Sequence, residues 1–335
     1  MLLIFTHKVT NRLTYMAKHL FERILGVEMA FTTKVEDFIK HNGPKMTYSK
    51  QPLQNEFFIR SNDLLFEQGI NDLEIKVSDW DGIPCFFASG EKSTIPFDIF
   101  SASFFLLSRY EEYLPHVKDS VGRFPVKESI AYQHNFLELP VVDLWAYRLL
   151  EALQERFPDL ETKEKSYNFT SIINVTTSHA YAMRGISRTL GGFLLDLGNF
   201  RFWEIWNRLS VLLRIKKDPY DNFFDLVEIH KKFPIKSMFF FQFAKHSAHD
   251  KNVSTNNNRF RYLIKSIADY SIVSLSTSFV STSDKNVLRE EKKQLGNLIN
   301  RPITYARLRY NKVNVPITYR NLVETEFTDD FSMGY

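Results

Sequence analysis

Residues 171–181 read Ser171-Ile172-Ile173-Asn174-Val175-Thr176-Thr177-Ser178-His179-Ala180-Tyr181, an apolar run that turns polar at its end. The stretch opens a series in which short strand-like runs alternate with amphipathic helical ones. Strand–helix pairs in series indicate a parallel sheet or a barrel. The predicted strands are 169–175, 235–244, 271–276 and 302–310, and the predicted helices are 220–233, 260–270, 284–300 and 316–324.

The first 158 residues predict a separate α/β domain. Residues 2–5 are a buried-strand run, and Thr10 or Asn11 is placed to cap a helix that Gly26 ends. A strand at 27–31 and helices at 35–41, 96–113 and 140–157 follow, with an Asp81-Gly82 turn between two short strands. Residues 159–167 are polar without an apolar period, so we expect domains 1–158 and 168–335 joined by a linker, 159–167.

Composition narrows the class of protein. Apolar residues make up 44% of the 335, which excludes a disordered chain. The 43 Lys and Arg against 39 Asp and Glu leave a net charge of +4, which does not indicate a nucleic-acid partner. The single cysteine, Cys85, cannot form an internal disulfide.

No run approaches the ~20 apolar residues of a membrane span, and the N-terminus lacks a signal peptide's apolar core. We therefore expect a soluble, cytoplasmic protein.

Three segments carry a family resemblance by their order along the chain. The first is 171–181, the second is Ala268-Asp269-Tyr270 with 272–279, and the third is Ala306-Arg307-Leu308-Arg309-Tyr310 with 316–322. With Ser-Arg-Tyr-Glu-Glu-Tyr at 108–113 and Ser-Met-Gly-Tyr at 332–335, they resemble the polysaccharide deacetylases (NodB-homology group, carbohydrate esterase family 4) in their two-domain Bacteroidetes form. The resemblance implies an α/β fold in which an N-terminal α/β accessory domain precedes a (β/α) deacetylase barrel.

The same resemblance implies chemistry that this sequence lacks. The family uses a carboxylate base and a divalent metal such as zinc, which one Asp and two His hold. Here Asn174 stands at the base position, Thr176 at the metal-binding Asp, and Ser276 and Arg309 at the two His. An amide cannot take up a proton at neutral pH, and a guanidinium cannot ligate a cation. We therefore expect no catalytic residue and no metal or other cofactor.

The reading that we favour is a catalytically inactive, deacetylase-like protein. It would bind a polysaccharide or an acetylated amino sugar through Asn174, Arg307 and Arg309, or regulate a protein partner. In full-length relatives the segment that 330–335 resembles continues into further strands, so the resemblance implies a truncated, incomplete barrel whose open edge a partner or a second copy covers. Two alternatives stay open: a metal-dependent hydrolase that removes acetyl groups from N-acetylated polysaccharide, and a decayed, truncated gene product.

Three further features have competing interpretations. His246, His249 and Asp250 have the spacing of a metal-ligand trio, but the Asn- and Ser-rich surroundings favour an exposed loop. His179 is expected to be packed or hydrogen-bonded rather than functional. The basic stretch 201–217, with two Trp residues, has the pattern of a helix on an anionic membrane surface. We expect it instead to pack its apolar stripe on its own domain.

Overall fold

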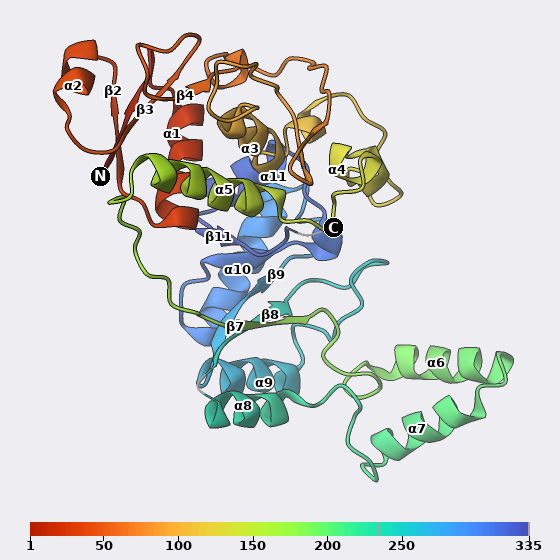
Figure 1. The fold of residues 1–335 in the computed structure, drawn as a ribbon. Coiled ribbons are helices and arrows are strands. Elements are labelled where there is room, and N and C mark those ends of the chain that lie inside the picture. Colours follow the sequence, from red (N-terminus) through yellow and green to blue (C-terminus); the bar gives the residue numbers. More distant parts are fainter. Residues whose placement is uncertain (234, 334–335) are drawn as a thin grey trace. The chain divides into compact units, whose positions relative to one another are not determined.

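The computed structural model describes residues 1–233 and 235–333, and the chain divides into two compact units. The first unit comprises Met1–Val117 and Phe124–Tyr167, and the second comprises Lys118–Arg123 and the residues from Asn168 onward. Each unit combines helices with a parallel sheet, so the predicted α/β class is confirmed (Figure 1). Gly334 and Tyr335, the end of the Ser-Met-Gly-Tyr string, lie outside the described residues.

A four-stranded parallel sheet in the order β2-β1-β3-β4 forms the first unit's centre. Its strands are β1 (Leu2–Phe5), β2 (Met29–Thr32), β3 (Lys45–Ser49) and β4 (Phe57–Arg60). Because side chains alternate along a strand, β1 serves both faces. Leu2 and Ile4 enter the main core, whereas Leu3 and Phe5 pack with Phe38 of α2 (Val35–Lys40).

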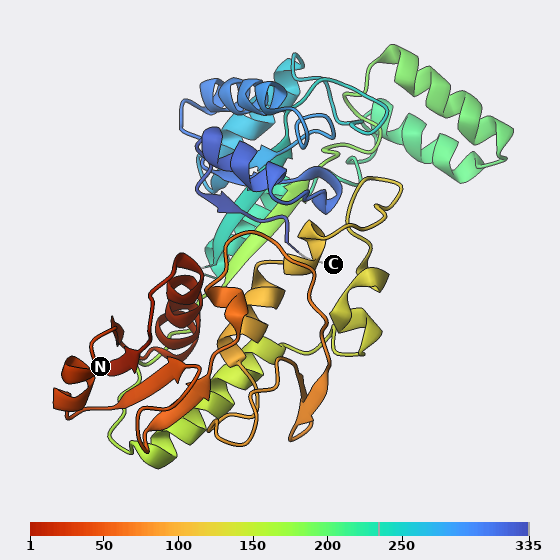
Figure 2. The same ribbon diagram turned by 90° about the horizontal axis from the view of Figure 1, so that it is seen from above.

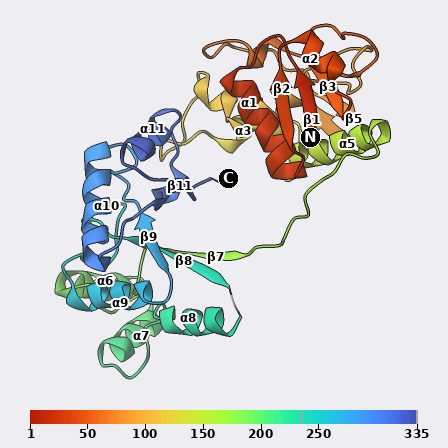
Figure 3. The same ribbon diagram turned by 90° about the vertical axis from the view of Figure 1, so that its left-hand side faces the viewer.

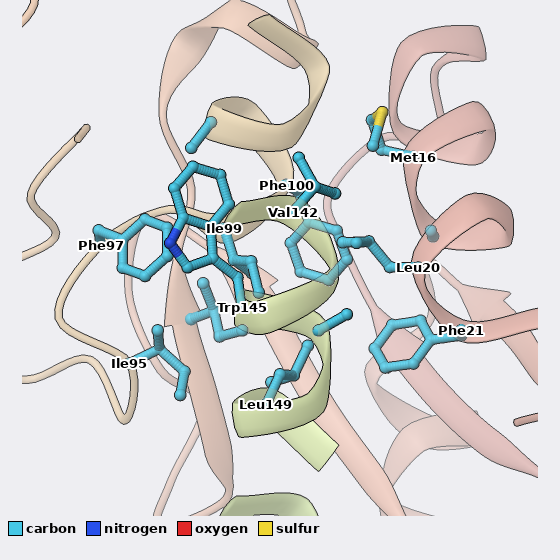
Figure 4. Packing of buried hydrophobic residues seen from close by; sticks show 14 of the residues in the cluster. Met16, Leu20, Phe21, Ile95, Phe97, Ile99, Phe100, Val142, Trp145 and Leu149 are labelled. Carbon is cyan, nitrogen blue, oxygen red and sulfur yellow. The ribbon is translucent and has the colours of Figure 1, made fainter. Parts of the chain in front are cut away.

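Three helical segments cover the main core of the first unit: α1 (Asn11–Ala17) with the π-helix η1 (Lys18–Leu25), α3 (Ile99–Leu107) and α5 (Val141–Arg156). Figure 4 shows Trp145 of α5 at the centre of this packing. Its ring lies 5.1 Å from that of Phe97 and 5.9 Å from that of Phe86, and its Nε1 donates to the carbonyl of Pro84 at 3.0 Å. A buried Trp with a satisfied N–H combines a large apolar area with no lost hydrogen bond.

Local signals set several boundaries in this unit. Thr10 caps α1, and η1 ends at Gly26, which has a left-handed φ of 67°, as predicted. The helix expected over 96–113 is shorter, because Arg109 adopts φ 54° and the chain continues as a 3-10 turn, η3 (Tyr110–Tyr113). The Asp81-Gly82 turn joins antiparallel strands β5 (Ser78–Trp80) and β6 (Ile83–Cys85). The remaining short elements are η2 (Asp63–Leu65), η4 (Val126–Glu128) and α4 (Ile130–Gln133).

The second unit contains a five-stranded sheet whose parallel strands are neighbours in chain order. They are β7 (Thr170–Val175), β8 (Lys236–Gln242), β9 (Ile272–Ser276), β10 (Tyr305–Arg307) and β11 (Asp329–Asp330). Right-handed connections between successive parallel strands place the connecting helices on one face, as in half of a barrel. Figure 3 shows this curled sheet with its helices.

The helices of the second unit share one apolar cluster with the sheet. They are α8 (Phe223–Lys232), α9 (Asn258–Ala268), α10 (Lys285–Ile299) and α11 (Ile317–Glu324). Phe239, Phe241 and Leu275 are fully buried and face them. Because alternate residues of a strand point to opposite faces, the other residues of β7–β10 point to the inner face. The helices therefore leave that inner face uncovered.

A helical hairpin interrupts the strand–helix alternation between β7 and α8. It consists of α6 (Ile186–Gly198), which the sequence patterns did not predict, and α7 (Phe202–Leu212). Figures 1 and 2 show it extending away from the sheet of its own unit. The prediction that stretch 201–217 packs its apolar stripe on its own domain is wrong, because Trp203 and Trp206 are 68% and 54% exposed. No helix in the described part of the chain has both the length and the apolar character to cross a membrane.

Asp98 is the most heavily bonded carboxylate of the first unit. It caps α3 by accepting from the backbone N–H groups of Phe100 and Ser101, both at 3.1 Å. Its other oxygen accepts from the Tyr48 hydroxyl at 2.8 Å, the Asn62 N–H at 2.6 Å and the Ser101 hydroxyl at 2.7 Å. Burial raises the pKa of Asp98, although these donors oppose the shift. The side chain thus ties β3, α3 and the loop after β4 together.

We predict that Asp98→Ala destabilises the first unit by about 3 kcal/mol or more, because it leaves several buried donors without an acceptor. Chemical denaturation followed by tryptophan fluorescence measures the effect, in chains where Trp203→Phe and Trp206→Phe leave the signal to the first unit's Trp80 and Trp145. The control is Asp79→Ala, whose exposed carboxylate accepts a single bond from the Gly82 N–H, at 2.8 Å. We expect it to cost less than about 1 kcal/mol. Equal losses in the two variants would contradict an anchoring role for Asp98.

Candidate functional site

A row of polar side chains lies at the carboxyl ends of the second unit's strands. Gln242 of β8 is in register with Ser276 of β9, and Ser276 is in register with Arg307 of β10. Residues in register on parallel strands point to the same face, here the inner one. Asn174 of β7 is in register with Phe240, one layer further in on the same face, and Thr176 lies in the bend that follows β7. The sequence-predicted positions Asn174, Ser276 and Arg307 therefore share one face.

The row has unused hydrogen-bonding capacity. Gln242 and Ser276 are each only 1% exposed, yet the Gln242 Oε1 and Ser276 Oγ atoms have no hydrogen-bond partner among the described residues. The same holds for the Nε atoms of Arg307 and Arg309. Leaving such a group buried and unpaired costs about 1–3 kcal/mol, so folded proteins retain few of them. Three of these atoms lie at the ends of neighbouring strands, and the fourth, Arg309 Nε, has the Asp250 carboxylate at an ion-pair distance of 3.7 Å.

The carboxylate of Asp250 holds the loops around this row. It is 2% exposed and accepts from Gln242 Nε2 at 2.6 Å, from the Ser247 hydroxyl at 2.8 Å and from the Phe279 N–H at 3.1 Å. The Nε atom of Arg309 lies 3.7 Å from its Oδ1 atom, at ion-pair distance. These partners use the carboxylate's acceptor sites and offset its charge. Asp250 therefore acts as an anchor rather than as an available base.

Arg309 lies within a rim of rings. It belongs to the short 3-10 turn η5 (Arg309–Asn311), and its Nη2 donates to the carbonyl of His249 at 2.9 Å. The His249 ring stacks on that of Phe279 at 4.1 Å, and the Tyr310 ring lies 4.5 Å from the guanidinium carbon of Arg309 and 6.0 Å from Phe279. The loops after β8, β9 and β10 thus each supply one ring to the rim.

Arg307 is held from the C-terminal side of the sheet. Its Nη1 donates to the carbonyl of Phe331 at 2.7 Å. The Phe331 ring lies 5.2 Å from that of Phe240 and 5.7 Å from that of Tyr305, both of which belong to the inner face. The residues after β11 therefore fill the inner layer beneath Arg307 with apolar rings. No carboxylate is recorded within ion-pair distance of Arg307 among the described residues.

The segment after β7 is fixed by polar contacts of its own. The Asn252 side-chain oxygen accepts from the N–H of Ser178 at 2.9 Å and from its hydroxyl at 3.1 Å. His179 is 3% exposed, and its Nδ1 lies 3.2 Å from the Ser178 hydroxyl. The expectation of a packed, hydrogen-bonded His179 is confirmed. Burial lowers its pKa, so the imidazole is neutral at pH 7.

The His246, His249 and Asp250 trio does not converge. His246 and His249 are exposed in an irregular loop, as expected, whereas Asp250 points inward to its own partners. Within residues 1–233 and 235–333, no cluster of three or more His, Cys, Asp or Glu side chains is arranged to hold a metal ion.

The sequence analysis did not predict that Gln242, Phe279 and Tyr310 belong to this group of residues. A polar residue that ends an apolar strand, as in Phe239-Phe240-Phe241-Gln242, was the available signal.

Comparisons with known proteins add the following. Residues 2–158 match the model of a family of unknown function, DUF7033. The crystal structure of a protein described as a polysaccharide deacetylase from Mycobacterium smegmatis is similar to this chain with a TM-score of 0.30 and 14% identity. That similarity covers 50% of this chain and 53% of the other, so the chain spans about half the length of its structural neighbour. No curated protein matches the sequence.

Glu291 of α10 lies beside the site and makes the stability of the folded state depend on pH. Its carboxylate is 5% exposed and accepts from the N–H of Ser278, next to the Phe279 N–H that Asp250 holds. Burial raises the pKa of Glu291, and the negative charge of Asp250 adds to the shift. The folded state therefore binds this proton more tightly than the unfolded state. The free energy of unfolding consequently falls as the pH rises from about 4 through the raised pKa.

We predict that Glu291→Gln, which keeps an acceptor for the Ser278 N–H but removes the charge, has an equal or higher free energy of unfolding at pH 7. Its free energy of unfolding should also fall less than that of the unmodified protein as the pH rises above about 4. Denaturation series across this pH range measure both effects. Glu290→Gln is the matched control, because Glu290 is its exposed neighbour. A loss of more than about 1 kcal/mol at pH 7 in Glu291→Gln alone would show that the charge itself is needed.

Proposed function

We propose that this protein is a deacetylase-like carbohydrate-binding protein without deacetylase catalysis. Its ligand would be a polysaccharide or an acetylated amino sugar bound at the strand ends of the second unit. The observation that carries the proposal is the row Gln242–Ser276–Arg307 with its unpaired buried atoms. A sugar hydroxyl both donates and accepts, so it suits a site that offers unpaired donors and acceptors together.

The surroundings of the row support the same ligand class. Arg307 and Arg309 present forked donors, which suit a carboxylate and can also donate to an acetyl carbonyl. The rings of Phe279 and Tyr310 lie beside Arg309, and ligand sites commonly combine aromatic rings with a few placed polar groups. Asn174, exposed on the same face, adds an amide that can donate and accept.

The residues at the catalytic positions do not suit the family's reaction. Asn174 cannot act as a base, and the hydroxyls of Thr176 and Ser276 are weak ligands for a divalent cation. The Arg309 guanidinium brings a fixed positive charge to the strand ends, and its nearest recorded carboxylate, Asp250, is engaged with donors. A divalent metal such as zinc therefore does not fit this set of side chains. We propose no step that passes through one.

We predict that the protein binds N-acetylated amino-sugar oligomers and that Arg309→Gln weakens binding by about tenfold, the loss expected for one charge-assisted contact. Isothermal titration measures the dissociation constants. Arg320→Gln is the matched control, because Arg320 is an exposed arginine on α11 of the same unit. Equal affinities in both variants and the unmodified protein would contradict binding at the strand ends.

Activity is tested separately, in the presence of zinc and the same oligomers. The unmodified protein is compared with a variant that carries Asn174→Asp, Thr176→Asp, Ser276→His and Arg309→His. We expect no acetate release from the unmodified chain, because it lacks a base. Acetate release above a protein-free blank would overturn the proposal that the protein lacks deacetylase activity, and it would favour a hydrolase with a rearranged site. Release by the variant alone would show that the scaffold still positions these four side chains.

A further inference from the structure

The α6–α7 hairpin, residues 186–213, presents its apolar side chains to solvent. Those of α6 recur at intervals of three or four residues and so form one stripe, and those of α7 do the same. The exposed stripe residues are Ile186, Leu190, Leu194 and Leu197 on the first helix, and Phe202, Trp206 and Leu209 on the second, followed by its C-cap residue Leu213. Phe200, in the turn between the helices, is 79% exposed. A water-soluble helix pair would turn such stripes inward.

An ion pair is buried in the interior of the hairpin. Arg208 Nη2 donates to Asp196 Oδ2 at 2.6 Å, and the two side chains are only 10% and 12% exposed. The Arg208 guanidinium also lies over the rings of Tyr181, at 5.0 Å, and Phe193, at 5.6 Å. A Cβ atom at Gly192 would come within 2.5 Å of this guanidinium, so the glycine makes room for it. Charged groups inside and apolar groups outside suit an apolar surrounding medium.

The positive charge of the chain is concentrated in the same region. Residues 184–217 hold seven Arg or Lys and two Asp or Glu, a net charge of +5, whereas the whole chain carries +4. Arg201, Arg214, Lys216 and Lys217 are exposed, and Lys216 Nζ lies 5.5 Å from the Trp203 ring. Basic residues beside exposed Trp rings are the pattern of a segment at an anionic membrane surface.

The hairpin is also fixed firmly to its unit. Asp218 accepts from the N–H groups of Ala180, Tyr181 and Ala182 at 2.8–2.9 Å and from that of Tyr220 at 3.0 Å, so it joins the two chain ends of the insertion. Arg188 Nη1 donates to the carbonyl of Asn252 at 3.0 Å. Asn252 in turn binds Ser178, next to the end of β7. The hairpin is therefore attached to the loops at the strand ends.

We propose that the α6–α7 hairpin is a membrane-surface anchor. The apolar stripes enter the acyl-chain boundary of one leaflet, and Arg201, Arg214 and Lys216 contact anionic lipid headgroups. At 13 residues, α6 is roughly 20 Å long, shorter than the ~30 Å hydrocarbon core, so the hairpin lies in one leaflet rather than spanning the bilayer. Apolar groups on both helices and on the turn, around a charged interior, favour a continuous apolar medium over a protein partner with one binding patch.

Flotation with lipid vesicles tests the proposal directly. We expect the full chain to bind vesicles of phosphatidylcholine with about one third phosphatidylglycerol, and to bind pure phosphatidylcholine more weakly. Trp203→Ser with Trp206→Ser should lower the partition coefficient about tenfold or more, because the variant lacks two rings that would be buried at the membrane interface. The control, Tyr262→Ser with Val323→Ser, removes side chains that are each 72% exposed elsewhere in the unit, and should leave binding unchanged.

Charge and depth are measured in parallel. Arg201→Gln, Arg214→Gln and Lys216→Gln together should reduce binding to the anionic vesicles and its dependence on salt. Lipids brominated along the acyl chain should quench the fluorescence of the unmodified protein more than that of the double Trp variant. Circular dichroism confirms that each variant is folded.

Two outcomes would overturn the anchor. One is that vesicle binding is absent, or is the same in the double Trp variant and in the control variant. The other is self-association without lipid that the Trp substitutions abolish, measured by light scattering, while lipid binding stays absent. That result would assign the stripes to an interface between copies of this chain.

Discussion

The chain order of the parallel strands is the constraint on which the second unit depends. Because β7 to β11 are neighbours in sequence order, right-handed connections put α8, α9, α10 and α11 on the same face. The outward residues of the strands become the core. The inward residues do not face these helices, and they include the polar side chains of Gln242, Ser276 and Arg307. The polar row at the strand ends follows from this topology, as the sites of (β/α) barrels do.

A single carboxylate then organises the row. Asp250 comes from the loop after β8, but its donors come from the end of β8, from the loop after β9 and from the turn after β10. It thereby fixes Gln242, Phe279 and Arg309 relative to one another. Its charge is offset by Arg309, whereas Arg307 has a neutral carbonyl as its recorded partner. Arg307 and Arg309 thus bring two guanidinium groups to the strand ends, and Asp250 is the carboxylate within ion-pair distance of Arg309.

Periodicity predicted most elements of both units, because most helices and strands here bury one regular face. It missed strand β3 of the first sheet, and it failed at three further kinds of place. Helix α6 has Gly185 at its N-cap and Gly191-Gly192 within it, so neither a capping side chain nor helix propensity marks it. Strand β11 consists of Asp329 and Asp330, without an apolar residue. The site's central contacts join residues far apart in sequence, such as Asp250 and Arg309, and no local pattern encodes such a pair.

The fate of stretch 201–217 shows why a pattern can be right about a helix and wrong about its surroundings. Amphipathic spacing fixes which residues share a face, but not what that face contacts. In α7 the buried residues are Arg208, Ser210 and Val211, whereas the large rings of Trp203 and Trp206 are exposed. In water this arrangement is unfavourable in two ways, because apolar area stays exposed and because the buried ion pair loses its hydration. Conflicts between a local rule and the global fold concentrate at functional sites, and this one follows β7, the strand that carries Asn174. A lipid surface would remove the first cost and would hold the open strand ends beside the membrane.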